Sequence, residues 1–317
     1  MRHIWLVLLL APVLSFSATA DLDSDTLLKT GRADKALRLL NNEVQAHPDN
    51  AAAYNQLCRV YFQLEMWDSA LHMAEKSTSL EPSSSFYHQW LGRAAGRKAE
   101  NSNPFTAFGL ARKVKSEFER AVALDGRNLS ARADLVEYYL EAPGFLGGDK
   151  NKARQQADAV APHDPGLADY LYARVEEKQG SGLAEQGYQR AIASSSDAAR
   201  YWVELAYFYR RAGRPQEMEQ AIDRSLGASG HDGMPEFDAA FLLLRTGRNF
   251  PEAIRMLREY LDDHTSEEGP AFRAHYLLGE LLEKQGDHEH AKEEFRAALS
   301  LASQFRPARD ALARISR

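Results

Sequence analysis

The chain has 317 residues, 44% of them hydrophobic and 26% charged, and a formal net charge of −6. This composition is ordinary for a soluble globular protein, and the length allows two globular domains or one elongated array of repeats. The absence of a basic excess argues against polyanion binding as the main activity, so no nucleic-acid partner is expected. The single cysteine, Cys58, excludes an intramolecular disulfide framework and is interpreted as a core residue.

The first twenty residues differ from the rest of the chain. A short basic start precedes a nearly continuous apolar run at 4–14, and the small residues Ala18 and Ala20 follow it. This pattern predicts a secretory signal peptide at 1–20, because the apolar run is too short to span a bilayer comfortably. We expect a mature chain that begins at Asp21, is periplasmic if the source is Gram-negative and otherwise secreted, and is not stably inserted in a membrane. An uncleaved anchor is the alternative.

The stretch 51–84 predicts two short amphipathic helices. Apolar side chains recur at helical spacing on both sides of a break near Glu65, and Pro82 ends the second helix. Neither helix is long enough to be stable alone in water, so each must bury its apolar stripe against a neighbour. A preceding hairpin has its turn at Gly31 and ends at Pro48, thirty-four residues before Pro82.

A helix-turn-helix unit with this period is typical of tetratricopeptide repeats, and the chain resembles that family. The resemblance rests on the turn glycine, the terminating prolines and matching small and large helix positions: Ala36, Ala70, Tyr54, Leu57 and Tyr61. Similar units continue to residue 305, with Gly213 and Gly247 again thirty-four residues apart. The resemblance covers roughly nine-tenths of the mature chain and implies an all-α, right-handed superhelical solenoid of eight repeats.

Two insertions interrupt the period. The third repeat has about ten extra residues near 94–113, and the fourth has about five more in a glycine-rich turn at 141–149. We predict an N-terminal repeat array at 21–165, a C-terminal array at 166–305 and a charged capping helix at 306–317. The first repeat is expected to be truncated, because its first helix would begin inside the signal peptide.

No pattern in the chain predicts catalysis, a cofactor or a metal. Ser229, His231 and Asp232 are the residue types of a hydrolase triad, but neighbours on one short loop rarely converge as a triad must. His288 and His290 stand two apart on a predicted helix and point in different directions, unlike a zinc-binding pair. We therefore predict a protein that is not an enzyme, with Asp287 as a helix cap.

The family resemblance implies that a protein or peptide partner binds in the concave groove lined by the first helices. Matching the family's groove positions to this sequence gives Asn55, Arg59, Gln89 and Arg93 as partner-binding candidates. Either arginine can hold a carboxylate through paired donors. Asn55 and Arg59 are in a different order from the family's terminal-carboxylate clamp, and the other clamp residues are absent, so that activity is not inferred.

Aromatic residues give two further candidates. Phe105 and Phe145 lie in the two insertions, where exposed rings would mark an interface. The cluster of Tyr207, Phe237 and Phe241 is interpreted as core packing, because aromatic side chains usually bury.

The leading hypothesis is a non-enzymatic scaffold outside the cytoplasm that acts in envelope or secretion assembly. The alternative is a protein that binds a small ligand or a polysaccharide, or an enzyme accessory subunit, with the two inserted loops as a lid over the groove.

Overall fold

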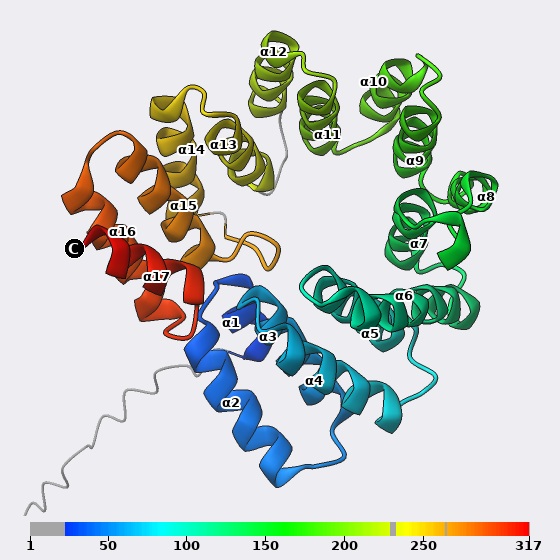
Figure 1. Ribbon diagram of the computed structural model, residues 1–317, viewed down its shortest axis with the longest axis horizontal. Helices are drawn as coiled ribbons and strands as arrows, with labels where there is room; N and C mark the ends of the chain where they lie inside the picture. Colours follow the sequence, from blue (N-terminus) through cyan, green and yellow to red (C-terminus); the bar gives the residue numbers. More distant parts are fainter. Residues whose placement is uncertain (1–22, 229–232, 264, 317) are drawn as a thin grey trace, which may run out of the picture.

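The computed structural model describes residues 23–228, 233–263 and 265–316, and these residues form helices and turns without a strand. Figure 1 shows the helices following one another in chain order around a ring. The predicted all-α solenoid of helix-turn-helix repeats is therefore confirmed. Among the described residues, no helix is long and apolar enough to cross a membrane.

Eight helical hairpins form the solenoid, and one more helix follows them in the part of the chain that the structure describes. The first helices are α1 (Ser24–Lys29), α3 (Ala51–Gln63), α5 (Ser85–Glu100), α7 (Leu129–Glu141), α9 (Pro165–Gln179), α11 (Ala198–Arg211), α13 (Met234–Thr246) and α15 (Ala271–Lys284). The second helices are α2 (Ala33–Ala46), α4 (Trp67–Leu80), α6 (Pro104–Leu124), α8 (Lys150–Val160), α10 (Ala184–Ser194), α12 (Pro215–Leu226), α14 (Phe250–Asp263) and α16 (His288–Leu301), and α17 is Arg306–Ile315. Helices α7, α9, α11 and α13 lie inside their partners in Figure 1.

Local sequence signals set the ends of the helices. The side chain of Asn50 caps α3 by accepting from the backbone N–H of Ala53 at 3.0 Å. Asp287, the predicted cap, does the same for α16 by accepting from the N–H of His290 at 3.3 Å. Gly31 follows α1 with a φ of +63°, as its predicted role at a helix end requires.

Glycines bring the two helices of some hairpins into close contact. A Cβ atom at Gly92 would lie 2.4 Å from the ring of Phe118, and one at Gly279 would lie 2.5 Å from the ring of Phe295. Each glycine in a first helix therefore provides the space that an aromatic ring of the second helix fills. Both phenylalanines are buried, so these contacts form part of the core.

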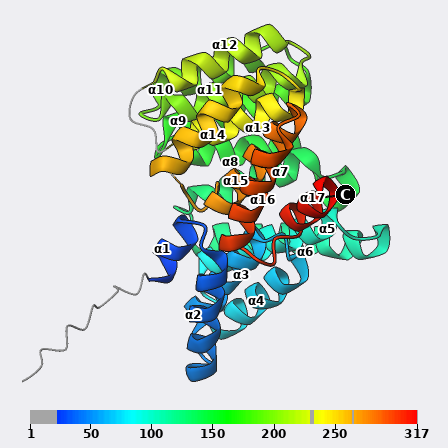
Figure 2. The ribbon, with the colours of Figure 1, turned by 90° about the vertical axis from the view of Figure 1, so that its left-hand side faces the viewer.

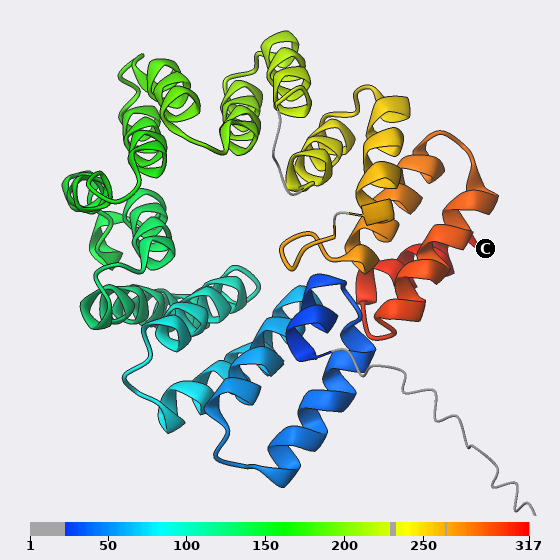
Figure 3. The ribbon, with the colours of Figure 1, turned by 180° about the vertical axis from the view of Figure 1, so that it is seen from behind.

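The two ends of the solenoid pack against each other and close the ring. One buried apolar cluster contains Leu28 and Leu37 of the first hairpin together with Phe272 and Ala298 of the last hairpin and Phe305, which precedes α17. Figures 1, 2 and 3 show these blue and red segments side by side from three directions. We call this contact the seam. Each end of the array covers the apolar side of the other. From the sequence, only the capping helix at 306–317 was expected to cover an end of the array.

The backbone also fits tightly at the seam. A Cβ atom at Gly31 would lie 2.5 Å from the backbone nitrogen of Ala271, so glycine is required there for space as well as for its positive φ. On the same boundary, the carboxylate of Asp34 accepts from the backbone N–H of Ser303 at 3.0 and 3.1 Å. The segment expected to be a capping helix forms α17, which packs on α15 and α16.

The two insertions differ in structure. The first was expected to be an inserted loop, but its residues lengthen α5 and α6, which leaves only 101–103 as the turn between them. Asn103 caps α6, and Pro104 occupies the first turn, where proline needs no hydrogen-bond donor. The second insertion is a loop, and it contains a short 3-10 helix, η1 (Gly144–Leu146).

The first hairpin is short, because α1 has only 6 residues. The predicted signal peptide at 1–20 lies outside the described residues, and so do His231 and most of the loop that contains it.

Candidate functional site

The strongest polar contact across the seam joins Arg59 of α3 to Glu267, which precedes α15. Arg59 Nε donates to one carboxylate oxygen of Glu267 at 2.8 Å, and Nη2 donates to the other. Gln63, one turn further along α3, donates from Nε2 to the backbone carbonyl of Glu267 at 2.9 Å. Helix α3 thus holds both the side chain and the backbone of one glutamate.

Aromatic rings support the Arg59 guanidinium. Its carbon lies 5.8 Å from the ring centre of Phe86 and 5.9 Å from that of Trp90, both on α5. The Arg59 side chain is only 16% exposed. Burial works to lower the pKa of Arg59, but the hydrogen bonds and charge of Glu267 outweigh it and raise the pKa. Arg59 therefore stays charged in this partly buried place.

Arg93 also lies near the ring of Trp90. Its guanidinium carbon lies 5.2 Å from the Trp90 ring centre, and its Nε donates to Asp134 of α7 at 2.7 Å. Gln89 is 2% exposed and donates to the same carboxylate at 2.7 Å and to the Ser130 hydroxyl at 2.8 Å. Trp90 therefore contacts both Arg59 and Arg93, and Gln89 shares the Asp134 carboxylate with Arg93.

The fourth, Asn55, is 1% exposed, so it does not lie on a groove surface as expected. Its Nδ2 is one of several buried polar atoms that have no hydrogen-bond partner among the described residues. Three others lie around the same place: Gln63 Oε1, Trp90 Nε1 and Arg273 Nε. Buried groups of this kind usually bind water or a ligand. They belong to α3, α5 and α15, the helices around the Arg59–Glu267 pair.

Both predicted arginines do hold carboxylates, but these belong to the chain itself. Asn55 and Gln89 are buried, so they do not lie on an open groove surface, and partner binding by the four residues stays a prediction. Two side chains that sequence analysis missed, Glu267 and Trp90, complete the arrangement. Glu267 lies in a connecting segment far along the chain, so helical spacing gave no signal for it, whereas Trp90 directly follows a predicted groove position.

A second ionic network lies further along the array. Arg174 of α9 is 9% exposed and donates to Glu137 of α7 at 2.8 and 2.9 Å and to Glu177 at 2.8 Å. Glu177 also accepts from the Tyr188 hydroxyl at 2.7 Å and pairs with Arg211 of α11. These bonds link three consecutive first helices, and equivalent helix positions in successive repeats could have predicted the pairing of Glu137 with Arg174.

The aromatic candidates of the two insertions lie at the protein surface. Phe105 is 93% exposed and Phe145 is 78% exposed. Phe108, also exposed, stacks on Phe145 with the ring centres 6.4 Å apart and an angle of 12° between the ring planes. The two insertions therefore meet. Phe237, by contrast, is buried in the core as predicted.

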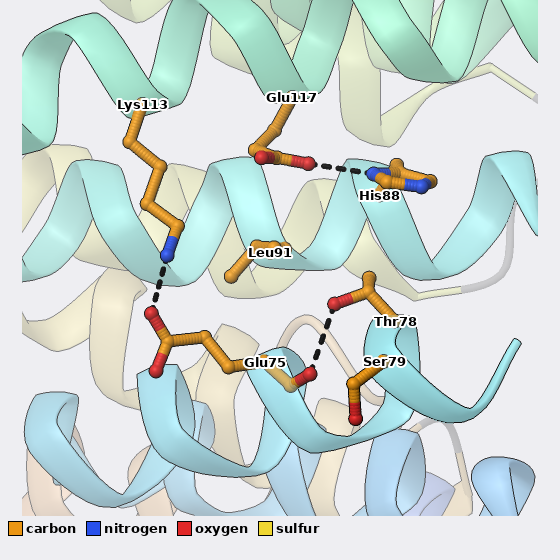
Figure 4. A pocket seen from close by; sticks show the side chains of 7 residues that line it. All are labelled: Glu75, Thr78, Ser79, His88, Leu91, Lys113 and Glu117. Carbon is orange, nitrogen blue, oxygen red and sulfur yellow. Dashed lines mark hydrogen bonds and ion pairs between the residues drawn. The ribbon is translucent and has the colours of Figure 1, made fainter. Parts of the chain in front are cut away.

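Two surface depressions lie elsewhere. Figure 4 shows the first, between α4, α5 and α6, where Lys113 pairs with Glu75 and His88 Nδ1 lies 2.6 Å from Glu117. Its polar groups thus already have partners. The second lies between the segments 163–165 and 194–201. Neither is lined by a predicted site residue. In the described residues, no group of three or more histidine, cysteine, aspartate or glutamate side chains is placed to hold a metal.

Comparison with known proteins gives matches to sequence profiles and to solved structures. Residues 27–89 match one sequence profile and residues 180–232 and 238–307 match another, and both profiles describe the tetratricopeptide repeat. Together they cover more than half of the chain.

Solved structures with a similar fold come from several sources. A thermophilic tetratricopeptide repeat protein of Thermus thermophilus is 18% identical with a TM-score of 0.48, over 58% of this chain and 98% of its own. A tetratricopeptide repeat protein of Parabacteroides merdae is 14% identical with a TM-score of 0.42, over 93% and 96% of the two chains. The human IFIT1 dimer with m7Gppp-AAAA is 13% identical with a TM-score of 0.46, over 88% and 70%.

Proposed function

The chain belongs to the tetratricopeptide repeat family, and from this premise we propose that it is a non-enzymatic scaffold outside the cytoplasm, which binds a partner segment on the inner side of the ring. The fold is consistent with a protein-interaction scaffold. The signal-peptide pattern at 1–20 supports export, and a role in envelope or secretion assembly follows from export together with the lack of a catalytic pattern in the sequence.

One observation carries the proposal: charged, aromatic and unpartnered polar groups gather around Trp90. Arg59 and Arg93 lie over the same ring, and buried polar atoms of Asn55 and Gln63 nearby have no partner among the described residues. The Arg59–Glu267 contact supports a site for carboxylates, because a glutamate of the chain is held here by its side chain and its backbone. We therefore place the partner-binding site here and expect the partner segment to be acidic.

The physical mechanism is shape combined with a few anchors. Stacked hairpins present one continuous surface, and most of the binding energy comes from a small number of aromatic and arginine side chains. A protein or peptide fits better than a nucleic acid, because the chain has a net charge of −6 and so lacks the basic excess that binds a phosphate backbone.

The alternative hypothesis, in which two inserted loops cover a small ligand, has less support. The first insertion is helical, and neither surface depression described above is lined by Phe105 or Phe145. No observation favours it over the scaffold.

A photo-crosslinking amino acid at Arg93 tests the proposal in extracts of the source organism. We expect it to capture a partner, and the same amino acid at Leu39, an exposed position on α2, serves as the control. Labelling from Leu39 alone would count against the inner site. Mass analysis of the exported protein tests the location, with Asp21 expected as the first residue and an intact Met1 contradicting cleavage.

A further inference from the structure

The two insertions meet at one place on the surface, and we propose that this place docks on an anionic lipid bilayer. We call Phe105, Phe108 and Phe145 the aromatic patch. Described residues with large, exposed apolar side chains number six, and three of them belong to this patch. The others, Leu39, Phe86 and Leu183, lie on separate helices or turns. The apolar exposure is therefore concentrated where the chain departs from the repeat pattern, which is typical of an interaction surface.

The structure holds the aromatic patch firmly. Asn103 caps α6 by accepting from the backbone N–H groups of Phe105 and Thr106, each at 3.1 Å. On the other side, the Tyr138 hydroxyl donates to the backbone carbonyl of Leu146 at 2.8 Å and fixes the loop next to Phe145. Because both supports are local and built from specific hydrogen bonds, the rings are presented by a preformed surface.

Positive charge continues from the aromatic patch along α6. Phe105, Phe108, Arg112 and Lys115 follow one another at spacings of three and four residues, so they share one face of the helix. Arg112 is exposed and forms no ion pair with any described residue. Lys115 lies against Gly147 of the second insertion and forms a long ion pair with Glu119 at 3.8 Å.

Residues 97–115 contain five basic side chains and one acidic side chain, although the net charge of the chain is −6. Arg97, Lys98 and Lys113 pair with Glu100, Asp68 and Glu75, so the positive charge that remains beside the aromatic patch comes from Arg112 and, in part, from Lys115. A positive face beside exposed rings complements a surface that is negatively charged and apolar just beneath.

The exposure of the rings favours a bilayer over a peptide. A peptide gains affinity by filling a groove that excludes water, and Phe105 projects from the surface with 93% of its area exposed. A bilayer interface needs no matching groove, because single rings enter between the headgroups while arginine and lysine bind lipid phosphates. The docking is peripheral, since no described helix is long and apolar enough to cross a membrane.

Vesicle flotation of the mature chain tests the proposal, with vesicles of equal parts phosphatidylglycerol and phosphatidylcholine compared with vesicles of phosphatidylcholine alone. We expect binding to the anionic vesicles that weakens with salt. The double variant Phe105→Ser/Phe145→Ser should lose at least about tenfold in affinity, because two apolar anchors are removed. The control Leu183→Ser removes an exposed apolar side chain elsewhere and should bind like the unmodified chain.

A third variant gives an independent readout. Phe105→Trp keeps an aromatic ring, and its fluorescence emission should shift to shorter wavelength on anionic vesicles if the ring enters the interface. The proposal is overturned if the unmodified chain does not float with anionic vesicles, or if the double variant floats equally well. A dimer that the double variant abolishes, without vesicle binding, would overturn it too and assign the aromatic patch to a second copy of the chain.

Discussion

Arg59 and Glu267 are 208 residues apart in the sequence and form a two-pronged ion pair across the seam of the ring. Each side chain is 16% exposed, so the pair is largely withdrawn from water. The solenoid is therefore joined end to end by an ionic contact as well as by an apolar core.

Replacing Glu267 by glutamine tests the ionic part of the seam. Glu267→Gln leaves Arg59 without its carboxylate, and we expect a loss of about 1–3 kcal/mol in the free energy of unfolding, as for hydrogen bonds to charged groups. Chemical denaturation followed by circular dichroism measures it. The control Glu100→Gln breaks an exposed pair with Arg97 and should cost less than about 1 kcal/mol. If both variants lost the same free energy of unfolding, the Arg59–Glu267 pair would contribute no more to stability than an exposed pair.

Replacing Phe305 by alanine tests the apolar part of the seam. Phe305 is 1% exposed and packs edge-on against Phe272 with ring centres 5.0 Å apart. Phe305→Ala should cost about 3–5 kcal/mol and loosen the contact between the two ends. Small-angle X-ray scattering should show a larger radius of gyration for this variant. Phe295→Ala, equally buried but between α15 and α16, serves as the comparison, and the same increase there would argue against a specific opening of the ring.

The thiol of Cys58 should be unreactive in the folded chain. Cys58 is fully buried, and burial raises its pKa to about 12 because a thiolate loses solvation there. At about pH 8 only about one molecule in ten thousand would carry the reactive thiolate. A colorimetric thiol reagent should therefore label the protein only after unfolding. Rapid labelling under native conditions would show that α3 opens easily or is placed differently.

Acid should weaken the network around Glu177. Burial works to raise the pKa of this carboxyl, but the hydrogen bonds from Arg211 and Tyr188 outweigh it and hold the pKa below its ordinary value of 4.5. A lowered pKa in the folded state adds stability above the unfolded value, and that stability is lost as the pH falls through the folded value. Stability measured against pH should therefore decline below about pH 4.5.

The variant Glu177→Gln isolates this contribution. It should be less stable than the unmodified chain at neutral pH, and the difference should shrink as the pH falls through the lowered pKa of Glu177, because the unmodified carboxyl then becomes protonated too. The control Glu289→Gln alters a fully exposed acid on α16 that pairs with Lys292, and its effect should be small throughout. A constant difference between Glu177→Gln and the unmodified chain at all pH values would rule out the assigned protonation.

The sequence by itself determined the repeating unit. Gly31 and Pro82 limit helices through backbone properties that do not depend on distant residues. The spacing of apolar residues predicted the hairpins, because a short helix must bury its apolar stripe against the next helix. The sequence also placed Phe105 and Phe145 in the two insertions, and for this reason it identified them as candidates for partner binding.

Only the tertiary structure decided that the first and last hairpins meet and close the ring. Ring closure depends on the sum of small rotations between neighbouring repeats, which no single residue encodes, so the meeting of Leu28 with the cluster around Phe305 was not predictable. For the same reason, the pairing of Arg59 with Glu267 and the burial of Asn55 could not be derived from helical spacing, since that spacing gives the face of a helix but not what lies against it.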